Sequence, residues 1–594
     1  MSKQTTYCFR RVVEYSEFFN GEKPIDIPAI LKQFNRNKLV RMAAISSLHY
    51  GNMHFPDNER TLFSDCSRKH ISHINSLFQS YYKRIGLSPN EKVQIVTYRT
   101  SLELWRQIFA IRAEDFNDTI EECDIEFTIF KVILALNEKI VSFKRREELY
   151  ELDELIFLNG FLTNDTNNYT LQSVLQPQMY YFRILVNYIS SNNILTSAIE
   201  NLFVNWGIKS WQQYYTTIIW LASETDKYYQ EKQNGIPVIS LEKMKLKDKT
   251  GLFSSSLVEH LCIGEDDYIP YEEVEGVSKN DLNIDFRKFR SKPFVKLKDG
   301  SGYVVINNQF LCERLFNSLY FDLLPLINGR KGSCGFFDYN KEFIEKVLFR
   351  QTFFNCLPMK CFTFPMRNSK EVLEKQNEPD FYVRTKQAEL IIVECKAIKM
   401  NGECRDDGDY IRLLDELHEK IVLKTRNLDK SRKEFHGDPE PIGVGQLIHH
   451  IDSIEADSFD WDNNIPNDVS YYPVIVFEDV RLLQPGLLSI INRWFYEEIE
   501  KKTDIILTEM DCKPIMVISI NTLYLYDKFI RQVGLTNVID AFLKKNAEYD
   551  ETTGKYRISE LADFDSFLRL NSFNKSGDIG VIVKKWLKKA LKNQ

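Results

Sequence analysis

The chain has 594 residues, of which 43% are hydrophobic, 27% charged and 13% aromatic, and its formal net charge is −7. This composition excludes a disordered or fibrous protein, and the length exceeds what one hydrophobic core supports, so about two to four domains are expected. The negative net charge excludes a protein that coats duplex DNA through overall basicity, so any nucleic-acid contact must be local.

Cysteine usage and the terminal sequence bear on the cellular compartment. The 11 cysteines include no C-x-x-C pair, which is the spacing of many zinc and redox sites. The N-terminal sequence lacks the apolar core of a signal peptide, and no apolar run approaches the roughly 20 residues of a membrane span. We therefore predict a cytoplasmic protein with reduced thiols and no membrane partner.

Residues 1–233 predict an all-α module. Apolar side chains recur at helical spacing, and the helix predicted over 87–111 opens with Ser88, Pro89 and Glu91, which are typical of a helix N-terminus. The module carries no recognised catalytic motif. Substrate recognition, regulation, or contact with a second copy or a partner protein is therefore the simplest role for it.

Residues 234–330 predict a mixed α+β connecting segment. The stretches "KPFVKLK" and "YVVINN" read as two strands joined by the turn "DGSG". One helix is predicted over 309–327, and the polar, glycine-rich stretch "NGRKGSCG" ends the segment.

Residues 331–540 alternate helices with short buried strands, which indicates an α/β domain with a mixed sheet. The predicted elements, in chain order, are a helix over 338–353, strands over 361–366, 379–384 and 389–397, a long charged helix over 410–434, a helix over 443–454, and strands over 470–479 and 513–520. Residues 541–594 predict a polar loop and a helical tail with a basic end.

Charged residues stand at the ends of two of these strands. Asp380 opens one strand, while Glu394 and Lys396 lie at the C-terminal end of the next, on one face, because side chains alternate along a strand. A hairpin would place Asp380 across from Glu394. Two such carboxylates suit Mg²⁺, and they repel each other without a compensating cation. For Glu394 and Lys396 alone, a surface ion pair is the alternative explanation.

The sequence Pro379-Asp380, followed by Glu394-Cys395-Lys396, resembles the motif of the PD-(D/E)XK nuclease superfamily. That family has a restriction-endonuclease-like core with the element order αβββαβ, and the order predicted here is similar over roughly a third of the chain. The resemblance implies that Asp380, Glu394 and the backbone carbonyl of Cys395 bind Mg²⁺, with Mn²⁺ able to substitute. It also implies that Lys396 orients or deprotonates the attacking water.

Two further site residues follow from the same resemblance. The family often has a glutamate on its first helix, and Glu345 is the best match, with Glu342 as the alternative. RecB-like members add a glutamine-led helix, which Gln446 resembles, although His450 stands where a tyrosine is usual. Glu345 would hold a second metal or a water molecule, and Gln446 would position the phosphate or the nucleophile. The long charged helix over 410–434 departs from the RecB-like pattern.

These observations lead to the expectation of a Mg²⁺-dependent nuclease, with DNA favoured over RNA and endonuclease over exonuclease. The arrangement is similar to restriction-type and anti-phage defence effectors. One alternative is an inactive nuclease fold that binds nucleic acid or serves as a scaffold. Another is a ribonuclease acting through the helical half, where Arg68 and His73 match the R-x4-H spacing of HEPN ribonucleases, with Lys69 as a departure.

Three basic stretches are candidate nucleic-acid surfaces, at residues 287–298, 424–433 and 584–592. Ordinary solvated faces are the alternative explanation for each of them.

Overall fold

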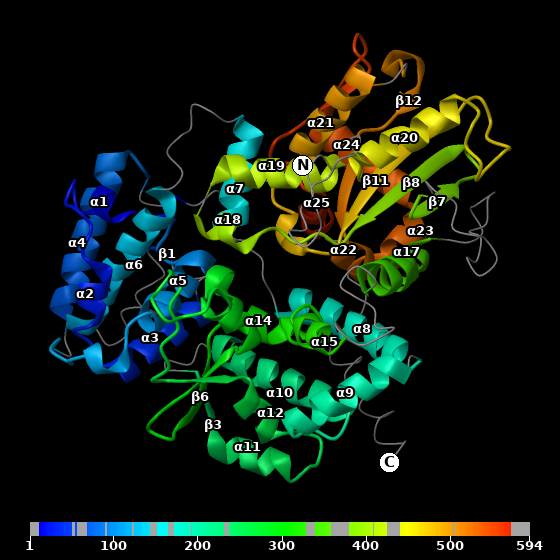
Figure 1. The fold of residues 1–594 in the computed structure, drawn as a ribbon. Coiled ribbons are helices and arrows are strands. Elements are labelled where there is room, and N and C mark those ends of the chain that lie inside the picture. The colour runs from blue at the N-terminus through cyan, green and yellow to red at the C-terminus, as the bar shows by residue number, and fades with distance from the viewer. Residues whose placement is uncertain are drawn as a thin grey trace.

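The computed structural model describes residues 11–49, 54–55, 68–88, 92–121, 124–142, 151–163, 171–191, 193–230, 237–327, 339–357, 379–407, 409–424, 440–502 and 505–571. These residues form a multidomain α/β protein in which helices predominate and several sheets are present (Figure 1). Within these ranges, none of the helices combines the length and the apolar character that a bilayer crossing requires.

The N-terminal part consists mainly of helices, with one short antiparallel pair of strands among them (Figure 1). The elements are α1 (Tyr15–Phe18), α2 (Ile27–Leu31), α3 (Arg36–His49), β1 (His54–Phe55), α4 (Arg68–Ile85), β2 (Val93–Gln94), α5 (Tyr98–Phe109), α6 (Ile125–Ser142), α7 (Leu152–Thr163), α8 (Leu171–Ser190), α9 (Asn193–Trp206) and α10 (Trp211–Gln230).

The helix predicted over 87–111 is wrong in its first part. Thr97 caps α5, because its hydroxyl accepts a hydrogen bond of 3.0 Å from the Thr100 N–H. Before this cap, β2 pairs with β1, and Gln94 also bridges to Val12. Val93 favours a strand, and the backbone of this stretch pairs with β1. The stretch is therefore extended, in spite of the helix-capping residues that precede it in the sequence. Residues 89–91 of that signal lie outside the described residues.

The middle segment contains a four-stranded sheet in the order β3-β6-β5-β4, and the predicted hairpin is confirmed as the antiparallel pair β5 with β6. Its elements are β3 (Val238–Ser240), α11 (Leu241–Asp248), α12 (Ser255–His260), β4 (Cys262–Gly264), η7 (Ile284–Phe286), α13 (Arg287–Ser291), β5 (Phe294–Lys296), β6 (Gly302–Val305), α14 (Asn308–Glu313) and α15 (Leu319–Ile327).

The single helix predicted over 309–327 is instead two helices, α14 and α15. Side chains from the N-terminal helices satisfy the backbone at the break. The Tyr214 hydroxyl donates to the Arg314 carbonyl, and the Asn317 N–H donates to Gln178 Oε1 at 3.1 Å. These partners replace hydrogen bonds that a continuous helix would make. They lie far along the chain, so the helical spacing of apolar residues in 309–327 could not reveal the break.

The C-terminal part carries the largest sheet, seen at the upper right of Figure 1. Its elements are the π-helix η8 (Tyr339–Phe349), α17 (Arg350–Cys356), β7 (Phe381–Arg384), β8 (Glu389–Lys396), α18 (Gly402–Asp407), α19 (Tyr410–Ile421), β9 (Leu423–Lys424), β10 (Glu440–Pro441), α20 (Val444–Glu455), β11 (Ser470–Phe477), η10 (Val480–Leu482), α21 (Leu487–Lys502), β12 (Asp511–Cys512), β13 (Met516–Ser519), α22 (Ile520–Leu525), α23 (Asp527–Val533), α24 (Leu535–Asn546), β14 (Ala547–Asp550), β15 (Lys555–Ile558) and α25 (Phe564–Leu570).

This sheet is mixed, as predicted. β7 is antiparallel to β8, whereas β8, β11 and β13 are parallel to one another. The long helix predicted over 410–434 is wrong, because α19 ends at Ile421 and β9 then pairs with β10. The strand predicted over 361–366 and the basic stretch over 584–592 lie outside the described residues, as does most of the basic stretch over 424–433.

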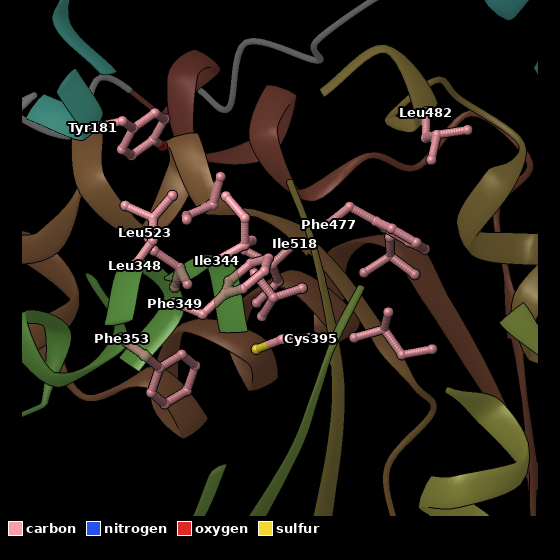
Figure 2. Packing of buried hydrophobic residues seen from close by; sticks show 14 of the residues in the cluster. Tyr181, Ile344, Leu348, Phe349, Phe353, Cys395, Phe477, Leu482, Ile518 and Leu523 are labelled. Carbon is pink, nitrogen blue, oxygen red and sulfur yellow. The ribbon is translucent and has the colours of Figure 1, made fainter. Parts of the chain in front are cut away.

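Two helical layers flank strand β8. Helix α20 packs against β8 and β11, while η8 also contacts β8. Figure 2 shows Cys395 of β8 among apolar side chains that include Ile344, Leu348 and Phe349 of η8. Cys395 therefore fills the apolar core on one face of the sheet, and its neighbours Glu394 and Lys396 project from the other face.

Two hydrophobic clusters organise the chain, and they interleave in sequence. One combines residues between 13 and 136 with residues between 263 and 310; the other runs from residue 157 to 568. The sheet β3-β6-β5-β4 contributes to both, because Phe294 and Tyr303 belong to the second cluster and Val295 and Val304 to the first. Alternation along the strands thus buries both faces of this small sheet.

Candidate active site

The hairpin β7–β8 brings the two predicted carboxylates together. Phe381 pairs with Val393, so one further step along the antiparallel register places Asp380 opposite Glu394. Asp380 Oδ2 accepts a hydrogen bond of 2.7 Å from the Cys395 N–H. The carboxylate of Asp380 is thus fixed against the backbone of the strand that carries Glu394 and Lys396.

Lys396 is held from two sides. Its Nζ lies 2.9 Å from Glu394 Oε2 and donates a second hydrogen bond of 2.8 Å to Gln446 Oε1. The Lys396 side chain is 13% exposed and that of Glu394 only 1%, so the pair is not the surface ion pair considered as an alternative. Little water reaches these two charges, so each is stabilised mainly by its partner. This requirement fixes the geometry of the pair.

Helix α20 supplies the groups that orient this pair. Gln446 Oε1 accepts from the Gly443 N–H at 2.9 Å as well as from Lys396. One turn later, His450 Nε2 lies 3.1 Å from Glu394 Oε1, and His450 is 2% exposed. The helix therefore contacts both members of the Glu394–Lys396 pair.

His450 was missed as a site residue by sequence reasoning. The available signal was its spacing of four residues from Gln446, which puts both side chains on one face of a helix.

The charges of the site differ sharply from one group to the next. Burial and, after it, the charge of the nearby Glu394 raise the pKa of Asp380 to about 8. Burial also opposes the ionisation of Glu394, but the charge of Lys396 and the contact with His450 outweigh it, so the pKa of Glu394 is lowered. At neutral pH the site therefore holds a charged Glu394 beside a largely protonated Asp380.

The pKa of Lys396 is raised. Burial alone would lower it, but Glu394 and then Asp380 more than compensate. Lys396 is consequently an ammonium group throughout the neutral range.

Glu345 lies on η8, within electrostatic reach of the site. Its charge is one of the causes that raise the pKa of both Asp380 and Lys396. Nothing is described for the side chain of Glu342, the alternative on the same helix. Of the two, Glu345 is thus the one that the structure relates to Asp380.

The donor set of the site fits a hard divalent cation. Asp380, Glu394 and the Cys395 carbonyl would supply the oxygen ligands that Mg²⁺ prefers, with water completing the shell. Burial and then the charge of the facing Glu394 raise the pKa of Asp380, and a cation between the two carboxylates would offset both causes. No set of three His, Cys, Asp or Glu side chains arranged to hold a metal was found among the described residues. The fit here rests on two carboxylates plus backbone.

The alternative site in the helical half lies elsewhere. His73 is an exposed residue of α4, and its ring contacts Phe127 edge-on. Nothing is described for the side chain of Arg68. The structure does not bring His73 into contact with Asp380, Glu394 or Lys396.

Replacing His450 by alanine is expected to destabilise the fold by about 1–3 kcal/mol, because Glu394 Oε1 would lose a buried partner. His450→Gln, which supplies an amide N–H in place of the ring nitrogen, should recover part of this loss. Urea denaturation of the variants measures it. The exposed neighbour gives the control, His449→Ala, which should leave the free energy of unfolding unchanged. Equal effects of the two alanine variants would contradict the role of His450.

Gly443 is expected to be intolerant of alanine. Its φ is +49°, and an added Cβ would lie 2.6 Å from the Ile421 carbonyl oxygen and 3.3 Å from Lys396 Cε. Gly443→Ala should cost about 1 kcal/mol or more and, by displacing Lys396, reduce any hydrolysis at least about tenfold. Thermal melts and rate measurements check this. Gly251→Ala is the control, with φ +69° but open space around the site of the added Cβ. If both variants behave alike, backbone strain alone explains the result.

Comparison with known proteins does not identify the chain. No family model, curated relative or solved structure matches it. Its function therefore has to be inferred from the geometry and charge of the site around Asp380, Glu394 and Lys396.

Proposed function

We propose that this protein is a Mg²⁺-dependent nuclease that hydrolyses phosphodiester bonds, with DNA as the favoured substrate and Asp380, Glu394 and Lys396 as its catalytic centre. Endonucleolytic cleavage, as in restriction-type or defence effectors, is the form of activity that the motif favours. The cytoplasm is the proposed location, and the six described cysteines, which are all buried and form no disulfide with one another, support a reducing compartment.

One observation carries the proposal. The register of β7 and β8 puts Asp380 opposite Glu394, and the repulsion between them helps to keep Asp380 protonated at neutral pH. Facing carboxylates next to a fixed ammonium group form an unfavourable arrangement for stability alone. A divalent cation and a phosphate together supply the charges that this arrangement lacks.

The residues of the chain have distinct parts in such a reaction. Asp380, Glu394 and the Cys395 carbonyl would hold Mg²⁺, which when bound stabilises negative charge on the phosphate oxygens. Glu394 also fixes the Lys396 ammonium group at 2.9 Å, and Gln446 holds it from the other side. Glu345, by its charge, would favour cations at the site.

Lys396 acts as a cation in this proposal. Because its neighbours raise its pKa, it stays protonated near neutral pH and cannot accept a proton from water as the resting protein stands. Its contribution is electrostatic: it neutralises charge that develops on the phosphate in the transition state.

The basic stretch over 287–298 does not support nucleic-acid binding. Four of its six basic residues form ion pairs: Lys288 with Asp281, Arg290 with Glu313, Lys296 with Glu259 and Lys298 with Asp266. These pairs neutralise most of the charge that a phosphate backbone would contact.

The test incubates the purified full-length protein with plasmid, linear duplex, single-stranded DNA and RNA, in Mg²⁺, in Mn²⁺ and in EDTA. Cleavage is expected with both metals and absent with EDTA, and Asp380→Asn should abolish it. The exposed carboxylate gives the control variant, Asp468→Asn, which should cleave as the wild type does. Cleavage that persists in EDTA or in Asp380→Asn would refute the proposal. Calorimetric titration with Mg²⁺ accompanies the assay, and the absence of both binding and cleavage would refute it as well.

A further inference from the structure

A second charged cavity lies away from the proposed catalytic centre. It has a volume of about 470 Å³ and is enclosed by α5, α6, α18 and the segment 271–284. Pockets that hold small ligands have volumes of roughly 300–1,000 Å³ and often occur where separate structural units meet. This cavity meets both conditions, because α5 and α6 belong to one hydrophobic cluster and α18 contributes to the other.

Buried cations dominate the interior of the cavity. Of the charged lining residues that are less than a tenth exposed, three are arginines and one is a glutamate, namely Arg99, Arg106, Arg405 and Glu103. Lys139 of α6 also lines the cavity, as does the partly buried Asp406. Three further acids of the lining, the exposed Glu272 and Glu273 and the half-buried Glu403, stand with Lys279 on the solvent side, so the excess of cations is confined to the interior.

The carboxylates of the interior are already occupied. Asp406 Oδ1 accepts from Arg99 at 2.9 Å, and its Oδ2 lies 2.9 Å from Arg106 Nη1 and accepts from the Asp285 N–H at 2.7 Å. Glu103 Oε1 accepts from Gln107 at 2.9 Å, and its Oε2 lies 2.7 Å from Arg106 Nη2. Each of these acceptors therefore contacts a donor within the protein, although the ion pair of Glu103 Oε2 with Arg106 is not a hydrogen bond.

Two guanidinium groups of the lining carry donors without a partner in the part of the chain that the structure describes. The Nε atoms of Arg106 and Arg405 are buried and have no hydrogen-bond partner within the described residues. Arg405 bonds Asp285 through Nη1 at 2.8 Å, yet burial still lowers the pKa of Arg405 to about 10, assisted by the charges of Arg481, Arg290 and Arg99. A buried donor on a cation without an acceptor indicates a missing water or ion.

We propose that this cavity binds a small phosphate-bearing anion of nucleotide size, with Arg106, Arg405 and Lys139 as its contacts. The cations come from three different helices, α5, α18 and α6. Converging donors of this kind suit a phosphate, which spreads its acceptors over three oxygens, better than a planar carboxylate. The guanidinium group is the side chain best matched to such an oxyanion.

A short segment of chain connects this cavity to the proposed catalytic centre. Arg405 and Asp406 lie on α18, which follows strand β8 and Lys396 after a short connection. Within that connection, the partly exposed Lys399 forms an ion pair with the buried Glu478, which follows β11. An anion bound at Arg405 thus contacts the segment that continues from the strand carrying Lys396.

Calorimetric titration of the full-length protein tests the site, with EDTA present so that metal-assisted binding at Asp380 and Glu394 is excluded. The probes are inorganic pyrophosphate, ATP and, as a carboxylate control, citrate. We expect pyrophosphate or ATP to bind with a stoichiometry of one. Lys139→Gln should weaken this binding about tenfold, as the loss of one charge-assisted hydrogen bond does. Arg405→Gln should weaken it at least as much, and Lys139→Gln remains decisive if that variant fails to fold.

The matched control is Lys131→Gln, which changes a lysine of the same helix outside the cavity and should leave binding intact. Lys396→Met should also bind normally. Failure of every phosphate probe to bind overturns the inference, as does equal weakening by Lys131→Gln and Lys139→Gln. Binding lost in Lys396→Met but kept in Lys139→Gln would move the anion to the catalytic centre. Citrate binding as tight as that of pyrophosphate would overturn the assignment to phosphate.

Discussion

Lys396→Met is expected to lower the rate of phosphodiester cleavage by about 100- to 1,000-fold, the range found when one preorganised donor to a developing oxyanion is removed. The ammonium group is the one described cation that contacts both Glu394 and Gln446. The measurement is a single-turnover cleavage rate on the substrate that the wild type cuts best. A rate within about threefold of the wild type would contradict the catalytic role of Lys396.

Stability has to be separated from catalysis in this variant, because Glu394 would keep a buried charge without its partner. Removing one member of a buried ion pair costs about 3 kcal/mol or more, whereas removing both is often neutral. The double variant Glu394→Gln with Lys396→Met should therefore regain stability and stay inactive. Lys399→Met removes the partner of the buried Glu478 nearby, and this control should lose stability but keep its activity in the folded fraction.

The same assay decides between the nuclease and the ribonuclease in the helical half. His73→Ala should cleave like the wild type, since His73 lies on α4 away from the catalytic centre. Cleavage of RNA that depends on His73 and not on Lys396 would support the alternative.

Magnesium binding is expected to release a proton and to strengthen steeply with pH. The pKa of Asp380 is raised to about 8, so Mg²⁺ must displace a proton from this carboxyl group near neutrality. Affinity should rise about tenfold for each pH unit between roughly 6 and 8 and then level off. Calorimetry in two buffers of different ionisation enthalpy measures the proton count. Affinity that is constant across this range would contradict the shift at Asp380.

The stability of the metal-free protein should show the opposite trend. The pKa of Asp380 is about 8 in the folded chain and 3.8 as its ordinary value, so the unfolded chain holds fewer protons between these limits. Stability from this group is therefore complete below about pH 4 and lost as the pH rises through 8. Asp380→Asn should lack this loss. Thermal melts across the pH range, with and without Mg²⁺, compare the two proteins.

The strands β7 and β8 were predictable because their signals are local. A run of four apolar residues, Leu390 to Val393, marks a buried strand, and alternation alone puts Glu394 and Lys396 on one face. The hairpin turn then fixes Asp380 opposite Glu394. Each of these steps needs only residues within about twenty positions of one another.

Features that depend on distant partners could not be predicted in this way. The start of α5 depends on β2 pairing with β1, and the break between α14 and α15 depends on Gln178 and Tyr214. The pair Arg99–Asp406 joins residues that are 307 positions apart. In a single sequence, such charged residues are interpreted as part of a solvent-exposed face. Nothing in their spacing reveals a buried partner so far along the chain.

The small sheet β3-β6-β5-β4 has a consequence for how the chain can be made and divided. Since Val295 and Val304 complete the first hydrophobic cluster, the N-terminal helices cannot finish packing until β6 has left the ribosome. A truncated chain that stops before residue 238 would expose the apolar surface that this sheet covers, and should aggregate during expression. Both hydrophobic clusters pack against this one sheet. Fragments that retain it, rather than fragments cut at the end of the helices, are the ones to express.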